Sequence, residues 1–173
     1  MMLTADEALA QLREGNGRFV NDGRVVNDLT SRERRSAVSG GQEPFAIVLG
    51  CADARVPAEI IFDHGLGDLF VIRVAGNVVA PSGVGSIEFA AERFGTRLVV
   101  VLGHSRCGAV VATLEELERP TENRSPNLSS IVDRIRPAVE PLLANGAASD
   151  PEALLQQAVH ANIAASVEFH EGG

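Results

Sequence analysis

Three short apolar runs dominate the hydrophobic pattern of this chain, at positions 45–50, 69–74 and 98–103. Polar residues do not alternate with the apolar ones in these runs, as they do in a strand with one face in water. Nearly continuous apolar runs of this length are typical of parallel strands that are covered on both faces. We therefore expect the three runs to form the core of a parallel sheet.

The first forty residues carry two signals for the start of a helix. Thr4 and Glu7 have the spacing of a capping box and precede an amphipathic pattern. Thr30 and Glu33 repeat that spacing before a second, shorter pattern. We expect a helical N-terminal arm over residues 3–40.

Helical patterns also separate and follow the apolar runs. A turn at Val56 and Pro57 leads into a helical stretch, and further helices are predicted over 83–94, 108–117, 128–143 and 151–169. Pro137 and Pro141 predict a break or a kink within one of them. Strands that alternate with helices indicate an α/β fold, a parallel β-sheet core flanked by helices. The length of 173 residues indicates a single domain, 1–173.

The charge balance and the terminal sequence limit the class of protein. The formal net charge of −8 argues against binding to nucleic acid or to an anionic membrane surface. No apolar stretch approaches the roughly 20 residues that span a bilayer, and the N-terminus lacks the basic and apolar regions of a signal peptide. We expect a cytoplasmic protein whose cysteines stay reduced.

Two cysteines and one histidine follow two of the apolar runs. Cys51 comes directly after the first run, and His104 and Cys107 come just after the third. The carboxyl ends of parallel strands meet at one edge of a sheet, where open α/β sheets bind their ligands. Two thiolates and one imidazole match the ligand number of a catalytic zinc site, which keeps its fourth position open. The sequence therefore predicts zinc held by Cys51, His104 and Cys107.

Two alternatives remain open at this point. Free cysteine is among the most buried residue types, so packing alone also explains both thiols. A fourth donor is available from Asp53, His64, His160 or His170, and it would make the zinc structural. His160 lies within an apolar helical pattern, and we expect it to be a hydrogen-bonded packing residue.

Asp53 and Arg55 follow Cys51 closely in the sequence. The Asp53 carboxylate can accept a hydrogen bond from a zinc-bound hydroxide, and Arg55 can keep that carboxylate ionised and in place. The alternative is an ordinary exposed salt bridge, which contributes little. We favour the first interpretation because the pair begins two residues from an expected ligand. We also expect Arg73 and Asn77 to order the loop over the site.

The same motifs resemble those of the β-class carbonic anhydrases. Cys51-Ala-Asp-Ala-Arg-Val56 is similar to the first signature of that family, and Glu88-Phe-Ala with Gly103-His-Ser-Arg-Cys-Gly108 is similar to the second. The resemblance continues through residues 67–77 and through Gly41-Gln42, and it covers the chain from about residue 3 to 168.

This resemblance implies a zinc enzyme that hydrates carbon dioxide reversibly to bicarbonate and a proton, through zinc-bound hydroxide. It implies one Zn²⁺ per chain and a homodimer or a larger homo-oligomer. The site residues that it implies are the metal ligands Cys51, His104 and Cys107, the catalytic pair Asp53 and Arg55, and the substrate contacts Gln42 and Gly108.

Two other functions share these residues. A hydrolase of carbon disulfide or carbonyl sulfide would keep the same ligands, and a non-catalytic zinc-binding dimerisation module would keep them without turnover. The non-catalytic module is suggested by the length of this chain. Family members usually continue beyond a helix such as 151–168 with another core strand and a final antiparallel strand. Without such a strand, we expect the run at 98–103 to lie at an open sheet edge.

Overall fold

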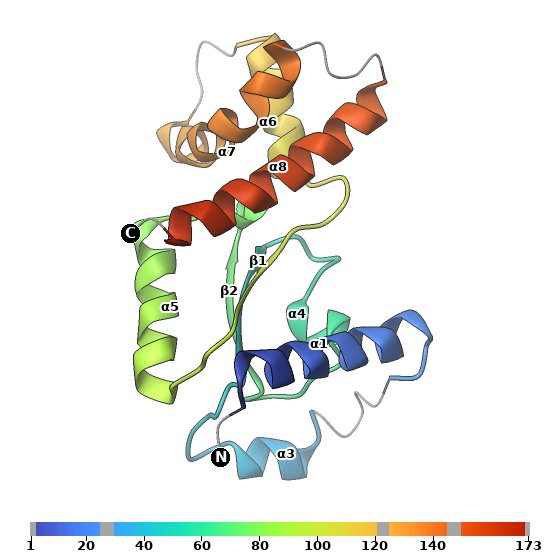
Figure 1. Cartoon of the computed structure of the whole chain (residues 1–173), viewed down its shortest axis with the longest axis vertical. Helices are drawn as coiled ribbons and strands as arrows, with labels where there is room; N and C mark the ends of the chain where they lie inside the picture. The colour runs from blue at the N-terminus through green and yellow to red at the C-terminus, as the bar shows by residue number, and fades with distance from the viewer. Residues whose placement is uncertain (1–2, 25–29, 121–124, 145–149, 172–173) are drawn as a thin grey trace. The chain divides into compact units, whose positions relative to one another are not determined.

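The computed structural model describes residues 3–24, 30–120, 125–144 and 150–171 (Figure 1). In chain order, its elements are α1 (Ala5–Val20), α3 (Arg32–Ala37), β1 (Ala46–Cys51), α4 (Ala58–Ile61), β2 (Leu69–Val74), the 3₁₀ turn η1 (Ala75–Asn77), α5 (Pro81–Phe94), β3 (Val99–Leu102), α6 (Gly108–Glu118), α7 (Pro126–Ala144) and α8 (Pro151–Glu171). The predicted alternation of strands and helices is confirmed.

The three strands form one parallel sheet in the order β2-β1-β3, which confirms the predicted fold class. All six residues of the central strand β1 are buried. The residues of β3 are only half-buried, and so are most of those in β2. The expectation that all three runs are covered on both faces is therefore wrong for β2 and β3. Within the described residues, β3 has a neighbouring strand on one side only, as expected for an open edge.

The chain divides into two compact units, and the first comprises Met1–Leu49, Ala54–Ile72 and Pro81–Val100. Its core is formed by Ile47, Ile87 and Ala90, with the rings of Phe70 and Phe94 packed against them. Within this unit, α1 docks on α4 and the turn that follows it. Arg18 Nε donates to the buried Asp63 carboxylate over 2.6 Å, and Asn16 Nδ2 donates to the Ile61 carbonyl over 3.0 Å.

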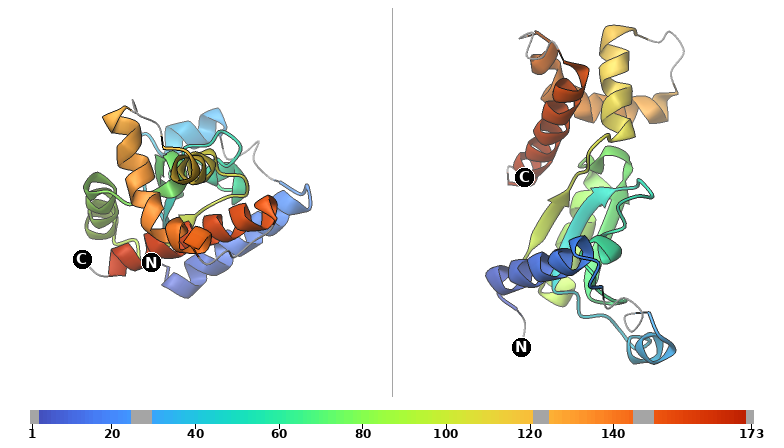
Figure 2. Two further views of the ribbon diagram at one scale, coloured as in Figure 1. Left: turned by 90° about the horizontal axis from the view of Figure 1, so that it is seen from above. Right: turned by 90° about the vertical axis from the view of Figure 1, so that its right-hand side faces the viewer.

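The second unit comprises Gly50–Asp53, Arg73–Ala80 and Val101–Gly173. It therefore contains the carboxyl-terminal residues of all three strands. Helices α6, α7 and α8 pack against one another (Figure 2). Each of them also contacts η1. Val110 of α6 and Ile135 and Val139 of α7 are buried. The turn η1 is thus enclosed by three helices.

Two sequence expectations about the helices need correction. At α3 the N-cap is Ser31, whose hydroxyl accepts from the Arg34 amide, so the helix begins one residue later than Thr30 predicts. Helix α7 continues through Pro137 and Pro141, so the predicted break is wrong. Both prolines are exposed, as is Asp133, so carbonyl groups that lose a helical hydrogen bond can be solvated. The capping box of Thr4 and Glu7 at α1 is confirmed.

Candidate metal centre

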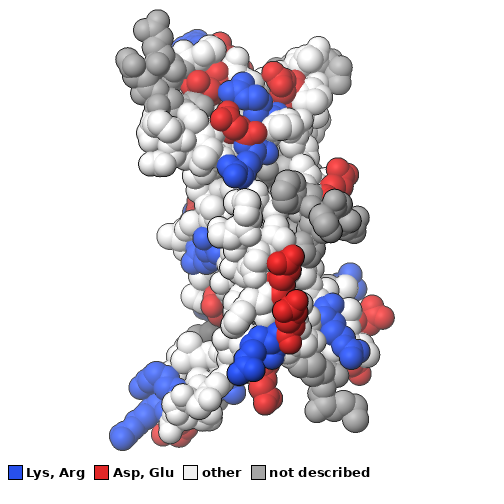
Figure 3. Space-filling view, turned by 90° about the vertical axis from the view of Figure 1, so that its left-hand side faces the viewer, with Lys and Arg blue, Asp and Glu red and all other residues white. Residues whose placement is uncertain are grey.

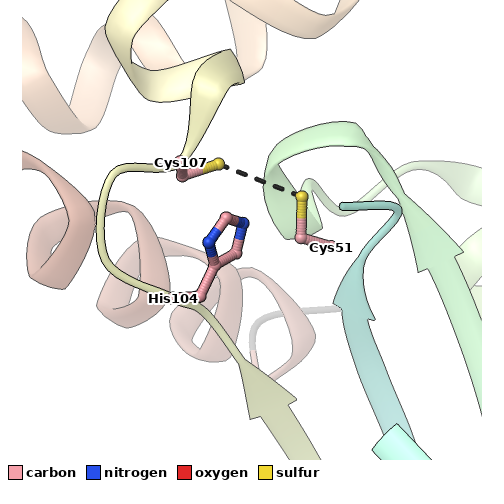
Figure 4. A group of neighbouring side chains, drawn as sticks. All are labelled: Cys51, His104 and Cys107. Carbon is pink, nitrogen blue, oxygen red and sulfur yellow. Dashed lines mark hydrogen bonds between the residues drawn. The ribbon is translucent and has the colours of Figure 1, made fainter. Parts of the chain in front are cut away.

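Three potential metal ligands meet within the second unit. Cys51 is the last residue of β1, His104 lies in the loop after β3, and Cys107 is the N-cap of α6. One ligand atom from each lies within 4.8 Å of the others, and Figure 4 shows the His104 ring directed between the two thiols. The convergence expected from the carboxyl ends of β1 and β3 is therefore confirmed.

The spacing of the donor atoms fits a tetrahedral metal ion. The Sγ atoms of Cys51 and Cys107 are 3.9 Å apart, and both cysteines are buried and unpaired by a disulfide. Two thiolates that each lie about 2.3 Å from zinc at the tetrahedral angle are about 3.8 Å apart. The observed sulfur pair therefore needs little rearrangement to hold zinc.

The His104 ring is oriented for coordination through Nε2. Its Nδ1 lies 3.0 Å from the Ser105 carbonyl, so the tautomer that donates from Nδ1 leaves a lone pair on Nε2. The Nε2 atom is buried and has no hydrogen-bond partner among the described residues. A buried nitrogen without a partner is costly in a packed site, and coordination would satisfy it. This orphaned atom is the strongest sign that the cluster holds a metal.

The environment of Cys107 favours the thiol until a metal binds. Burial raises the pKa of the Cys107 thiol, hydrogen bonds from the Val110 and Ala109 amides oppose that change, and the nearby Cys51 sulfur adds to it. A metal ion must therefore displace a proton from this side chain when it binds.

Arg73 orders the chain after β1. Its Nε donates to the Cys51 carbonyl over 3.0 Å, and its Nη2 donates to the Asp53 carbonyl over 2.6 Å. These two bonds hold the backbone on both sides of Ala52. The expectation that Arg73 orders this loop is confirmed.

The turn η1 contacts the Cys51 sulfur directly. The Gly76 amide donates to Cys51 Sγ over 3.3 Å. Gly76 adopts φ 71°, a left-handed conformation that favours glycine. A Cβ on this residue would lie 2.8 Å from Ile135 Cδ1 and 2.9 Å from Ala109 Cβ, so no larger residue fits.

Asp53 lies beside the cluster without joining it. Its Oδ2 is 3.8 Å from His104 Nε2, and its side chain is partly exposed. The described group of mutually close ligand atoms contains only the two cysteines and His104. Arg55 lies two residues later, in the turn that leads to α4, and is exposed.

The two expected substrate contacts lie in different units. Gly108 is the first residue of α6, directly after Cys107, and a Cβ there would meet no atom within 4 Å. Gln42 belongs to the first unit, where it lines a cavity of about 590 Å³ together with Arg93 and Arg97.

The remaining histidines have other surroundings. His64 belongs to the first unit, where its ring stacks edge-on against Phe45 at 4.8 Å and lies 3.9 Å from the Asp68 carboxylate. His160 is exposed on α8, so the expectation that it is a packing residue is wrong; it lines a pocket that also includes His104. The side chain of His170 lies outside the described residues.

Sequence reasoning missed the residues that hold η1 in place. Asn162 and Ser166 of α8 are both buried and donate hydrogen bonds to carbonyls of η1. The signal available in the sequence is a pair of polar residues four positions apart in an apolar helix.

The described part of the chain contains no helix that is both long and apolar enough to cross a membrane.

Comparison with known proteins gives a consistent family. A family model described as carbonic anhydrase matches residues 46–169. A carbonic anhydrase of Mycolicibacterium smegmatis and carbonic anhydrase 2 of Mycobacterium tuberculosis are each 46% identical over 128 residues, which cover 74% of this chain. The match spans only 61% of the length of each of these relatives.

Solved structures agree with this result. The β-carbonic anhydrase CcaA is 28% identical with a TM-score of 0.67, over 92% of this chain and 72% of that one. The β-carbonic anhydrase CafA of Aspergillus fumigatus is 25% identical with a TM-score of 0.69, over 94% and 73% of the two chains. Two signature motifs, the converging donors, the family match and these structures lead to one conclusion: the chain belongs to the β-carbonic anhydrase family.

Proposed function

We propose that this chain binds one zinc ion through Cys51, His104 and Cys107 and catalyses the reversible hydration of carbon dioxide to bicarbonate and a proton. The observation that carries the proposal is the cluster of two buried thiols 3.9 Å apart beside an imidazole nitrogen with no other partner among the described residues. The 46% identity to named carbonic anhydrases supports the reaction.

A zinc ion bound there would lower the pKa of a coordinated water molecule towards about 7 and so make hydroxide available at neutral pH. Asp53, whose carboxylate is 3.8 Å from His104 Nε2, is near enough to the donors to accept a hydrogen bond from the attacking water and orient it. In the proposal, Arg55 keeps that carboxylate ionised. The water oxygen forms a bond to the carbon of carbon dioxide, and the released proton passes to buffer.

The proposal gives the substrate oxygens two further partners. The Gly108 amide is at the start of α6, where backbone N–H groups are unpaired by the helix and the helix dipole favours negative charge. The side-chain amide of Gln42 is the second proposed partner. By analogy with the tetrameric β-carbonic anhydrases of Sordaria macrospora, we also propose a homodimer or a larger homo-oligomer. A cytoplasmic location fits the reduced thiols.

Elemental analysis of the purified protein combined with stopped-flow hydration of carbon dioxide across pH tests this function. We expect one zinc per chain and hydration that Asp53→Ala and Arg55→Ala depress without loss of zinc. Cys107→Ala should lose the metal. Stoichiometric zinc without hydration would instead identify a non-catalytic zinc-binding module. Hydrolysis of carbonyl sulfide or carbon disulfide that exceeds hydration would identify a sulfur-analogue hydrolase.

A further inference from the structure

Two buried polar residues of α8 hold the turn η1. Asn162 Nδ2 donates to the Gly76 carbonyl over 2.8 Å. Ser166 Oγ lies 3.2 Å from the Asn77 carbonyl and 2.9 Å from the Asn162 carbonyl, and it can donate to either. Asn162 is 3% exposed and Ser166 is 5% exposed, so water does not compete for these contacts.

The turn that they hold has a demanding backbone. Gly76 departs from helical geometry with φ 71° and ψ 18°, and both Gly76 and Asn77 are buried. A buried carbonyl without a partner costs about as much as a lost hydrogen bond, so η1 needs donors from outside. Helix α8 supplies them from residues 86 and 89 positions further along the chain.

The same glycine contacts both α8 and the metal cluster. Its carbonyl accepts from Asn162, and its amide donates to Cys51 Sγ over 3.3 Å. Fixing the carbonyl of Gly76 restricts the two dihedral angles that aim its amide at the sulfur. The side chain of Asn162 therefore controls a hydrogen bond to an expected zinc ligand that it does not touch.

A hydrogen bond to that sulfur has a chemical consequence. Two thiolates donate more negative charge to zinc than imidazoles do, which opposes the acidification of a coordinated water. An N–H group that donates to a thiolate withdraws part of that charge and also orients the ligand.

We infer that Asn162 is a positioning residue of the metal centre, which acts through Gly76 to hold the hydrogen bond on the Cys51 sulfur and thereby sets the strength of zinc binding. Ser166 supports the same turn from the next helical position on that face of α8. This inference rests on the proposed zinc site, and it adds residues that none of the sequence motifs contains.

The test compares variants by two measurements other than activity: zinc affinity by competition with a chelator, and the near-ultraviolet charge-transfer band from thiolate to cobalt after Co²⁺ replaces zinc. Asn162→Leu keeps the number and the branching of the side-chain heavy atoms and removes the donor. Thr113→Val is the matched control, because Thr113 is also buried but its hydroxyl donates within α6, to the Ala109 carbonyl over 2.8 Å. A purely structural role would lower stability in both variants and leave the metal measurements alone.

We expect Asn162→Leu to weaken zinc binding by about tenfold, because the hydrogen bond that orients the Cys51 sulfur is lost. The cobalt band should move to longer wavelength, since a thiolate without its hydrogen bond gives up electrons more easily. Thr113→Val should match the wild type in both. Wild-type affinity and an unshifted band in folded Asn162→Leu would overturn the inference.

Should Asn162→Leu not fold, Asn162→Ala replaces it, since alanine retains the helix and removes the same donor to the Gly76 carbonyl. A red-shifted band and weaker binding are expected there too, and wild-type behaviour of this variant would overturn the inference. The wild-type protein separates the two proposals. If it binds zinc and the variants match it, only this inference fails, whereas a wild type without zinc contradicts the proposed metal site itself.

Discussion

The Oδ2 atom of Asp53 lies 3.8 Å from Nε2 of His104, the buried nitrogen that has no hydrogen-bond partner among the described residues. The two side chains come from the ends of neighbouring strands, β1 and β3. If His104 binds the proposed zinc, a carboxylate this close to it would either contact a molecule on the metal or take a coordination position itself. These two roles differ in what Asp53→Asn would do.

We expect Asp53→Asn to retain one zinc per chain and to lose about 10- to 100-fold in carbon dioxide hydration, because the amide keeps the shape and loses the charge that orients water. Zinc content and stopped-flow hydration, measured on the same sample, check this. A variant that binds zinc much more weakly would show instead that Asp53 is itself a ligand.

The convergence of the three predicted ligands was predictable from the sequence because of their positions along it. Cys51, His104 and Cys107 follow apolar runs that become the neighbouring strands β1 and β3, and parallel strands bring their carboxyl ends to one edge. The burial of β1 was predictable for another reason, because nearly continuous apolar runs are typical of strands covered on both faces. An apolar run does not reveal whether its strand has a neighbour on each side, so the half-burial of β2 and β3 was not predictable.

Contacts over long sequence distances account for what was missed. Nothing near Asn162 indicates that its partner is Gly76, and the hydrogen bond forms only when α8 packs on η1. His160 was misjudged because its neighbours in α8 are apolar on several sides, so the periodicity does not define which face is buried. The roles of Asp53, Arg55, Gln42 and Gly108, and the single-domain organisation, stay predictions.

Two histidines that line one pocket provide a matched test of the ligand set. His104→Ala should lose zinc, since it removes one of three donor atoms that lie within 4.8 Å of one another. His160→Ala should retain zinc, because His160 is exposed and outside that group. Zinc content after gel filtration checks both variants. Loss of zinc from His160→Ala with retention in His104→Ala would reverse the assignment.

The raised pKa of Cys107 predicts how the metal-free protein responds to alkaline pH. Burial raises the pKa of this thiol in the folded state above the usual value of about 8.5. The folded protein therefore holds the proton more tightly than the unfolded chain, and this contribution to stability is present below about pH 8.5 and lost as pH rises through the higher folded value.

We accordingly expect the free energy of unfolding of the metal-free, reduced protein to fall as the pH rises above about 8.5. Urea denaturation in the presence of a chelator measures it, with Cys107→Ser as the control, because serine does not titrate there and the slope should diminish. Stability that rises over this interval would contradict the assigned direction. Zinc affinity should show the opposite trend and strengthen with pH, since binding displaces the proton.

The docking of α1 on the turn after α4 depends on one glycine, and a second glycine in the same helix offers the control. A Cβ on Gly15 would lie 1.7 Å from the Phe62 carbonyl oxygen, which is backbone and cannot swing away. A Cβ on Gly17 would meet no atom within 4 Å. The two positions therefore separate helix propensity from close packing.

We expect Gly15→Ala to destabilise the protein by about 2–4 kcal/mol, because α1 must shift and the buried Asp63 carboxylate would lose its bond from Arg18. Gly17→Ala should be neutral or stabilising by up to about 1 kcal/mol, the gain in helix propensity. Chemical denaturation of both variants, at fixed zinc, measures the difference. Equal stabilities would mean that α1 does not approach the Phe62 carbonyl in solution, and the close contact between α1 and that turn would have to be abandoned.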